Sequence, residues 1–375
     1  MALNGESLSI FNDRFIGIGT SRDMWVTNYS KEALINQVKY LIENYNKQVE
    51  EISEENQLNN NPSELNWSRG LKRRWEKKQK AIFNIENITE VHYRPFVKRY
   101  IYNDEFLVEY PSRWDKVITN KGNSIINILG GGSSKEFSTL ITNCITDYQM
   151  LFNNKSLPLY TFEENNLLAS SRNVNINSET LELFKETLNV KVTPEDVFYY
   201  IYGLMHSKEY RMNFSNDLKK TLPRVPIVRD FNSFKEAGIN LAKLHLNYED
   251  LELYPLNERI KSSDITEKYK VKKMKFGKNK DKSTIIYNEY VTLSEIPLEA
   301  YNYQVNGRSP LEWVIDQYQW KQDKNSGLIN DPNLYSTDEK YIVNLIKKLV
   351  TLSIETNKII ESLPSLNIIP IDDII

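Results

Sequence analysis

The sequence contains few of the residues on which cross-links and compact metal sites depend. Among its 375 residues there is one cysteine, Cys144, which excludes an intramolecular disulfide framework and a cysteine-rich zinc site. The three histidines, His92, His206 and His245, are far apart in the chain. A local metal motif is therefore excluded, although a metal site assembled in space stays open, and no metal is assigned.

Long apolar runs are also missing. No stretch of 18 apolar residues occurs, so we expect no transmembrane helix and no membrane partner. The first 15 residues lack the cationic and apolar regions of a signal peptide. A cytoplasmic location is the resulting expectation.

The formal net charge is only −2, from 48 basic and 50 acidic residues, but the cations are unevenly distributed. Two segments, 67–80 and 268–282, each contain a dense basic run with a single acid. Such runs most often form solvated faces. Here tryptophan, tyrosine and other apolar residues alternate with the cations, which favours a surface that neutralises a phosphate backbone. The candidate DNA contacts in these runs are Arg69, Lys72, Arg73, Arg74, Lys272, Lys273, Lys275, Lys278 and Lys280.

A third basic cluster lies in the segment YRPFVKRY. Arg94, Lys98 and Arg99 could make bidentate or single contacts to guanine or phosphate. An equally good interpretation is a set of surface ion pairs on an edge strand, which Pro95 would tolerate. The sequence leaves both open.

A triple glycine, Gly130–Gly132, follows the apolar run 125–129. Its backbone N–H groups could approach an anion, as in a phosphate or methyl-donor loop. However, the Walker spacing is absent and no acidic residue follows on a suitable second strand. A purely structural tight turn between strands is the favoured interpretation. The functional alternative is that Ser133, Ser134 and Lys135 donate to a nucleic-acid phosphate.

Recognised catalytic motifs are missing. The sequence has no G-x-S-x-G, no H-E-x-x-H and no N-P-P-Y tetrapeptide of the type that grips an extruded adenine. The lone G-x-G at Gly17 and Gly19 favours a structural turn. We expect the histidines to be core or helix residues, with His206 at a helix end.

Residue patterns predict an α+β chain with helical flanks, two or more β regions and a helical insert. Ser30 is expected to cap a helix, residues 69–80 to be helical, and 91–160 to be rich in strands with a turn at Asn103–Asp104. Later helices are expected after caps at Ser178, Thr193 and Thr337, the last over 341–360. Alternating lysine and apolar residues predict a strand over 269–276.

Several phrases in fixed order resemble the C-terminal part of the Type ISP restriction–modification enzymes, which are large single-chain proteins often labelled predicted helicases. They include IGTSRDMW, LNWSRGLKRRW, YRPFVKRYIYND, LGGGSSKEF, LPRVP and SGLINDPNLY. The resemblance covers nearly the whole chain. Tyr93–Phe96, Gly130–Phe137 and Leu222–Pro226 match family elements.

The resemblance implies a target recognition module for double-stranded DNA that positions an adenine for a methyltransferase located elsewhere in the full-length protein. It implies residues 1–90 as a helical connector or methyltransferase end, 91–335 as the recognition domain with an insert at about 175–250, and 336–375 as a C-terminal helix. Nuclease, translocase and methyltransferase regions would be partners in cis or as a subunit. AdoMet, ATP and Mg²⁺ would bind those regions and none would bind here.

Two other functions stay open at this point. One is a residual AdoMet-dependent methyltransferase that uses the Gly130–Gly132 turn. The other is a docking module for a translocase or methyltransferase subunit with little DNA contact. Under the main hypothesis the chain alone is catalytically inert and serves phage defence through the complete enzyme.

Overall fold

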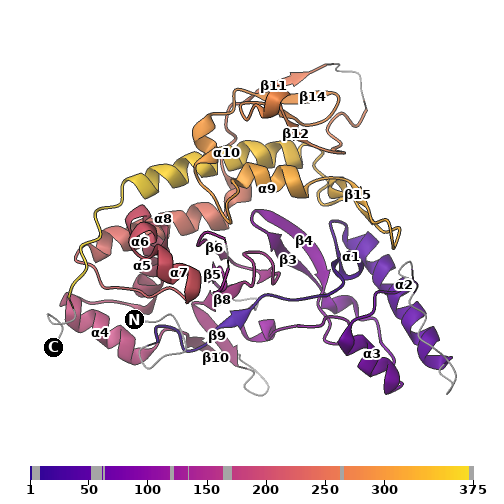
Figure 1. Ribbon diagram of the computed structural model, residues 1–375, viewed down its shortest axis with the longest axis horizontal. Coiled ribbons are helices and arrows are strands. Elements are labelled where there is room, and N and C mark those ends of the chain that lie inside the picture. The colour runs from indigo at the N-terminus through magenta and orange to yellow at the C-terminus, as the bar shows by residue number, and fades with distance from the viewer. Residues whose placement is uncertain are drawn as a thin grey trace.

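The computed structural model describes residue 1 and residues 9–51, 61, 64–118, 122–133, 135–163, 171–261 and 266–370. In these residues helices and small sheets are mixed along the chain, which confirms the predicted α+β class (Figure 1). The described helices include none long and apolar enough to span a membrane.

The helices fall into an N-terminal, a central and a C-terminal group (Figure 1). They are α1 (Asp23–Val26), α2 (Lys31–Glu50), α3 (Arg69–Glu76), α4 (Ser178–Leu188), α5 (Pro194–His206), α6 (Lys208–Asn213), α7 (Ser215–Lys220), α8 (Phe231–Leu246), α9 (Pro310–Gln317) and α10 (Tyr341–Glu361).

The strands are short. They are β1 (Phe15–Ile16), β2 (Thr27–Asn28), β3 (Ile88–Arg94), β4 (Val97–Tyr102), β5 (Ile125–Ile128), β6 (Thr139–Thr142), β7 (Ile145–Thr146), β8 (Lys155–Pro158), β9 (Tyr160–Glu163), β10 (Ser171–Val174), β11 (Asn257–Ile260), β12 (Lys275–Phe276), β13 (Ile285–Ile286), β14 (Val291–Ser294), β15 (Lys321–Gln322) and β16 (Ile329–Asn330).

Across the described strands the sheets have the orders β1-β8-β5-β6, β2-β4-β3-β7 and β11-β14-β13-β12, with two-stranded pairs β9-β10 and β15-β16. Strand β2 comes from the N-terminal helical region and pairs with β4. The predicted domain boundary at residue 90 lies within β3, and the three proposed domains stay a prediction.

The N-terminal helices form where their capping residues and apolar spacing predict them. The Ser30 side chain accepts from the N–H of Ala33 at 3.1 Å and caps α2, as predicted. The apolar face of α2 is buried, including Leu34, Val38 and Leu41, which recur at helical spacing. Helix α3 is capped by Ser68 and packs its buried Leu71 into the same cluster.

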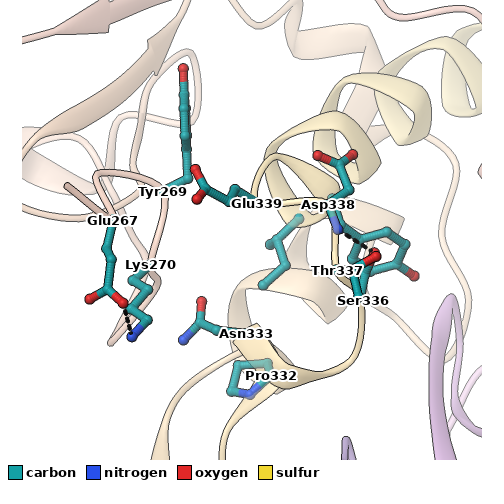
Figure 2. A pocket seen from close by; sticks show the side chains of 11 residues that line it. Glu267, Tyr269, Lys270, Pro332, Asn333, Ser336, Thr337, Asp338 and Glu339 are labelled. Carbon is teal, nitrogen blue, oxygen red and sulfur yellow. Dashed lines mark hydrogen bonds and ion pairs between the residues drawn. The ribbon is translucent and has the colours of Figure 1, made fainter. Parts of the chain in front are cut away.

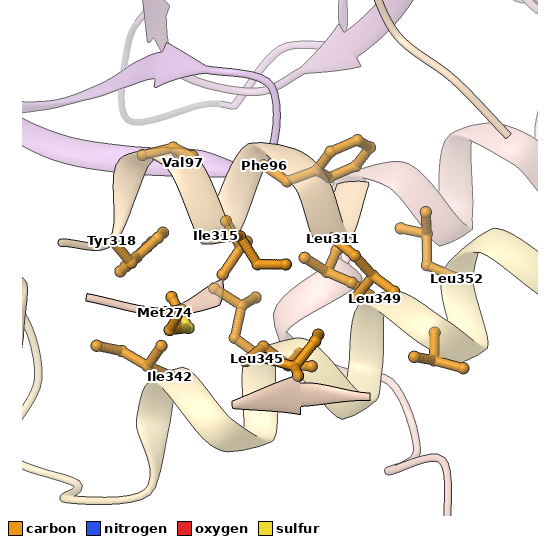
Figure 3. Packing of buried hydrophobic residues seen from close by; sticks show 14 of the residues in the cluster. Phe96, Val97, Met274, Leu311, Ile315, Tyr318, Ile342, Leu345, Leu349 and Leu352 are labelled. Carbon is orange, nitrogen blue, oxygen red and sulfur yellow. The ribbon is translucent and has the colours of Figure 1, made fainter. Parts of the chain in front are cut away.

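The C-terminal half is built around α10. One face of this helix is buried against α9, and Phe96 and Val97 from the β3–β4 hairpin join the cluster (Figure 3). Met274 of the basic run also inserts its side chain here, with 1% exposure. The apolar residues of the basic run thus fix it to α10, the longest helix among the described residues.

Several predicted boundaries were wrong. The strand-rich stretch 91–160 was predicted without the hairpin at its start, where the chain reverses at Pro95–Phe96, Phe96 has a φ of 59°, and β3 and β4 pair antiparallel. Helix α3 ends at Glu76, four residues before Lys80, and Lys78 has a left-handed φ of 55°. The predicted strand over 269–276 is regular only at β12.

Two predicted caps were also wrong. Asn177 rather than Ser178 caps α4, since its side-chain oxygen accepts from the N–H groups of Glu179 and Thr180 at 2.9 and 3.1 Å. Helix α10 begins after Lys340 with no side-chain cap, so Thr337 does not cap it. The Thr193 capping box of α5 was predicted correctly.

Candidate nucleic-acid interface

The first candidate surface, called here the α3 surface, consists of the exposed cations Arg69, Lys72 and Arg73. They border a shallow hollow together with Trp67, Ser68 and Glu76. Because Leu71 lies on the opposite side of the helix and is fully buried, these cations face outward. Their side chains have no ion-pair or hydrogen-bond partner among the residues that the structure describes.

The aromatic residues of this segment hold α3 in place. The Trp75 indole N–H donates to the Gln48 carbonyl at 3.0 Å, and the Trp67 and Trp75 rings meet edge to face. Arg74 is also engaged, since its guanidinium donates to the Glu105 carbonyl at 2.8 Å. Of the four cations predicted here, three are therefore free to meet a ligand.

The start of α3 is fixed by Glu109. Its carboxylate accepts from the Gly70 N–H at 3.0 Å and from the Ser68 hydroxyl at 2.6 Å. An anion at a helix start is favoured by the unpaired N–H groups and the helix dipole. The buried Arg22 also donates to Ser68, and burial lowers its pKa to about 10. These contacts give the α3 surface a rigid base.

The second candidate surface, called the lysine surface, consists of Lys272, Lys273, Lys275, Lys278 and Lys280. All five are exposed, and in the described part of the chain none has an ion-pair partner. Between them Val271 and Met274 are 1% exposed, so the predicted alternation of buried apolar and exposed cationic residues is present although little of the run is regular strand.

Two asparagines fix the backbone immediately before the lysine surface. Asn333 accepts from the Val271 N–H at 2.8 Å and donates to the Val271 carbonyl at 2.9 Å. Asn288 donates to the carbonyls of Lys268 and Lys270 at 2.7 and 2.9 Å. Neither asparagine could be predicted from the sequence, because each contacts backbone groups 18 or more positions away and no local signal marks such a side chain.

A hollow lies beside the lysine surface. Its lining includes Lys272, Lys273 and Lys275, the exposed Trp320, and the carboxylates of Glu289 and Asp331. A smaller neighbouring cavity is bordered by Glu267, Asp338 and Glu339, and Figure 2 shows Lys270 paired with Glu267, at 2.6 Å. The lysines of this region therefore lie close to several carboxylates at the edges of the two cavities.

The three cations of YRPFVKRY have intramolecular partners. Arg94 pairs with the nearly buried Asp147 at 2.6 Å, and Lys98 pairs with Glu249 and Glu90. Arg99 is buried, with its guanidinium 4.0 Å from the centre of the Tyr93 ring. Their role as DNA contacts stays a prediction, and the geometry gives each of them a structural role.

Two N–H groups of the Gly130–Gly132 turn are already bound to carbonyls of other segments. Gly130 donates to the Phe152 carbonyl and Gly132 to the Lys219 carbonyl, both at 3.2 Å. A Cβ on Gly130 would lie 2.4 Å from the Asn153 carbonyl oxygen, so the glycine permits a close backbone contact. This favours the tight-turn interpretation over a donor-binding loop.

The side chains that follow this turn are placed differently from one another. Ser133 is buried and its hydroxyl accepts from the Lys135 N–H at 3.0 Å. Lys135 is exposed. Ser134 lies outside the described residues. Only Lys135 among the described residues of this predicted trio can therefore reach a phosphate.

The histidines are buried in the core, and Cys144 is half-buried. The two ring nitrogens of His245 form hydrogen bonds with the Tyr202 hydroxyl at 2.6 Å and the Thr356 hydroxyl at 3.0 Å. Burial lowers the pKa of His245 to about 3. Burial raises the pKa of Cys144 to about 12, which disfavours the thiolate. The described residues contain no group of three or more metal-ligating side chains.

The chain matches a protein family and several solved structures. The profile of the family described as "Type ISP C-terminal specificity domain" matches residues 9–345. A nuclease-deletion mutant of the Type ISP restriction-modification enzyme LlaGI, in complex with a DNA substrate mimic, is 38% identical, with a TM-score of 0.87. The ATP-dependent Type ISP restriction-modification enzyme LlaBIII, bound to DNA, is 34% identical, with a TM-score of 0.90.

These matches cover 98% of this chain but only 29% of the LlaGI chain and 24% of the LlaBIII chain. This chain thus spans less than a third of either enzyme. The DrdV–DNA complex, 24% identical with a TM-score of 0.82 over 97% of this chain and 37% of that one, shows the shared fold alone. No curated protein matches the chain.

Proposed function

Since the chain belongs to the family of Type ISP C-terminal specificity domains, we propose that it recognises a short sequence in double-stranded DNA and positions an adenine there for a methyltransferase. The methyltransferase, translocase and nuclease would be regions of a longer protein or separate subunits. AdoMet, ATP and Mg²⁺ would bind those regions, and this chain alone would be catalytically inert.

The structures of two relatives support this proposal, because both contain DNA or a DNA mimic. LlaGI is in complex with a DNA substrate mimic and LlaBIII is bound to DNA. The parts of those enzymes that this chain does not cover leave room for catalytic regions. A cytoplasmic location and a part in phage defence belong to the same proposal.

The observation that carries the proposal is the state of the cations on the α3 surface and the lysine surface. In a chain of net charge −2, the side chains of both groups are exposed and lack described acidic partners. Each such cation can neutralise one DNA phosphate and release its condensed counterion. We therefore assign phosphate contact to these two surfaces and to Lys135, with base contacts made by side chains between them.

Salt dependence of duplex binding tests the proposal. Fluorescence anisotropy with a labelled duplex should show affinity falling by about 10³ between 50 and 200 mM salt if about six phosphates are contacted. Binding that is absent, or indifferent to salt, would contradict DNA recognition and favour the docking alternative.

A second measurement addresses the methyltransferase alternative. Calorimetric titration of the chain with AdoMet should give no binding heat, because two N–H groups of the Gly130–Gly132 turn already donate to the carbonyls of Phe152 and Lys219. Tight AdoMet binding would overturn the assignment of the methyl donor to another region.

A further inference from the structure

A cavity of about 610 Å³ lies near the segment that leads into α3, since the Asn66 amide donates to the carbonyl of Ser21 in its wall, and phosphate binding does not explain it. Three separate segments line it, namely residues 16–23, Tyr110 and residues 147–149. Tyr110 is 60% exposed at this site and Gln149 is also exposed. The cavity is therefore open to a ligand and has both an aromatic face and a free amide.

The cavity wall is joined directly to the start of α3. Gly19 and Tyr110 exchange backbone hydrogen bonds of 3.0 and 2.9 Å, and Glu109, which precedes Tyr110, accepts from the Gly70 N–H in the first turn of α3. Arg22 donates to the Asn66 carbonyl at 3.2 Å and to the Ser68 hydroxyl. A duplex held by the cations of α3 would thus lie next to this cavity.

Two carboxylates in the wall make it a poor phosphate site. Asp23 accepts from the hydroxyls of Thr20 and Tyr93, and Asp147 accepts from Arg94 at 2.6 Å. Arg94 and the buried Arg99 already interact with these two acids, and the described lining residues include no lysine or arginine that could hold a phosphate. A neutral base edge needs no such cation.

Gln149 is held on a rigid turn. Its N–H donates to the Asp147 carboxylate at 2.7 Å, and the Tyr148 N–H donates to the Ile18 carbonyl at 2.8 Å. A Cβ on Gly17 would lie 2.4 Å from the Asp147 carbonyl oxygen, so glycine permits the close approach of the two segments. A side chain that recognises a base benefits from such a fixed backbone, because less conformational entropy is lost on binding.

The Gln149 side chain is chemically free. Within the described residues its carboxamide has no hydrogen-bond partner. The asparagines beside the lysine surface differ in this respect, since the amides of Asn288 and Asn333 are bound to backbone groups. Glutamine donates and accepts in the pattern that adenine N7 and N6–H₂ present in the major groove.

From these contacts we infer that the cavity is a base-reading site and that Gln149 reads an adenine in it, with Asp147 and Arg94 as positioning residues. This inference rests on the proposed DNA recognition and adds the residue that sets one position of the target. Tyr110 would make apolar contact with the neighbouring base or sugar.

Selection from a pool of randomised duplexes tests the inference with the complete chain. Gln149→Ala should reduce the preference for adenine at one position by roughly 5- to 150-fold, with non-specific affinity and melting temperature unchanged. Gln149→Glu should move the preference at that position toward cytosine, because a carboxylate accepts from its N4–H₂. Gln79→Ala, an exposed glutamine just beyond α3, is the matched control and should change neither.

The outcomes separate the two proposals. A wild-type chain that shows no sequence preference for duplex DNA contradicts both. A clear wild-type preference that Gln149→Ala leaves intact at every position, or weakens equally at all of them, overturns this inference and leaves DNA recognition standing. A specificity switch in Gln149→Glu at one position supports direct reading, which a purely structural role of the residue would not produce.

Discussion

The Arg94–Asp147 ion pair links β3 to the turn that carries Gln149. The Asp147 side chain is 4% exposed, and burial raises its pKa to about 6 even though Arg94 acts in the opposite direction. Arg94 in turn lies over the Tyr93 ring at 3.9 Å. This pair stabilises the turn mainly while Asp147 is ionised.

The first prediction follows from this pair. Arg94→Met leaves a buried carboxylate without its cation, which should destabilise the fold by ~3 kcal/mol at pH 7.5. The pKa of Asp147 is higher in the folded state than in the unfolded state, so stability is lost as pH rises through the folded-state pKa. Removing Arg94 raises that folded-state pKa further. Urea unfolding should therefore show a smaller loss at pH 5, where Asp147 is protonated.

The control for this prediction is the double variant Arg94→Met/Asp147→Asn, which has no carboxylate to leave unpaired. It should recover part of the stability at pH 7.5 and show no difference in loss between the two pH values. An equal loss at pH 7.5 and pH 5 in the single variant would show that packing, and not charge, is what Arg94 provides.

Among the elements, helices α5 and α8 approach each other closely at Gly203 and Gly238. A Cβ on Gly238 would lie 1.8 Å from the Tyr199 carbonyl oxygen, and one on Gly203 would lie 2.0 Å from that of Phe234. Neither obstacle is a flexible side chain. The two glycines therefore set the separation of the helices, which carry much of the central hydrophobic cluster.

Gly238→Ala should accordingly destabilise the protein by ~3 kcal/mol or more, because the backbones must move apart. Thermal unfolding monitored by circular dichroism measures the effect. Asn240→Ala, at an exposed position of α8, is the control and should leave the melting temperature unchanged or slightly higher. A melting temperature for Gly238→Ala within experimental error of the wild type would disprove the close contact.

The same helices contain a pH-sensitive group. Burial lowers the pKa of His245 to about 3, below its ordinary value of 6.5. A lowered folded-state pKa contributes stability that is complete above pH 6.5 and is lost as pH falls toward 3, with a slope of up to ~1.4 kcal/mol per pH unit. His245→Gln should be less stable at pH 7 and should show a shallower decline.

Urea midpoints at pH 7, 6 and 5 test this prediction, since the midpoint reports stability when the slope against urea is constant. His92 is also buried with a pKa of about 3 and keeps its contribution in the variant, so the decline should be reduced and not abolished. Parallel curves for the two proteins would mean that His245 is not neutral in the fold.

Elements with strong end signals could be predicted from the sequence. Thr193 and Pro194 together specify both the start and the first turn of α5, and an apolar run predicted the buried strand β5. The hairpin turn at Pro95–Phe96 was missed because Phe96 adopts a positive φ that its side chain does not favour. Tertiary packing of Phe96 in the C-terminal cluster imposes it.

For the whole molecule, the local sequence identified the basic runs but not the residues that pair with the cations. The run at 268–282 and the run at 67–80 were found because they are local in sequence. The pairing of Arg94 with Asp147, 53 residues away, could not be found in that way. Nor could the cavity, since it joins three segments that meet only after folding.

The last prediction asks whether the α3 surface and the lysine surface hold one duplex. Each cation removed should reduce the slope of log affinity against log salt by ~0.9. The triple variant Lys272→Ala/Lys273→Ala/Lys275→Ala should therefore lose ~2.7 of that slope for every sequence alike. The variant Arg69→Ala/Lys72→Ala/Arg73→Ala should lose the same.

If both surfaces contact the same duplex, the two losses add in the six-fold variant to ~5.4, because each cation releases its counterions independently. Salt titration of the wild type, both triple variants and the combined variant measures this directly. A variant lacking the exposed lysines of the helical insert, Lys191, Lys208 and Lys243, serves as the control for total charge and should keep the wild-type slope. A combined slope no smaller than that of one triple variant would mean that a single surface carries the DNA and that the other faces a different partner.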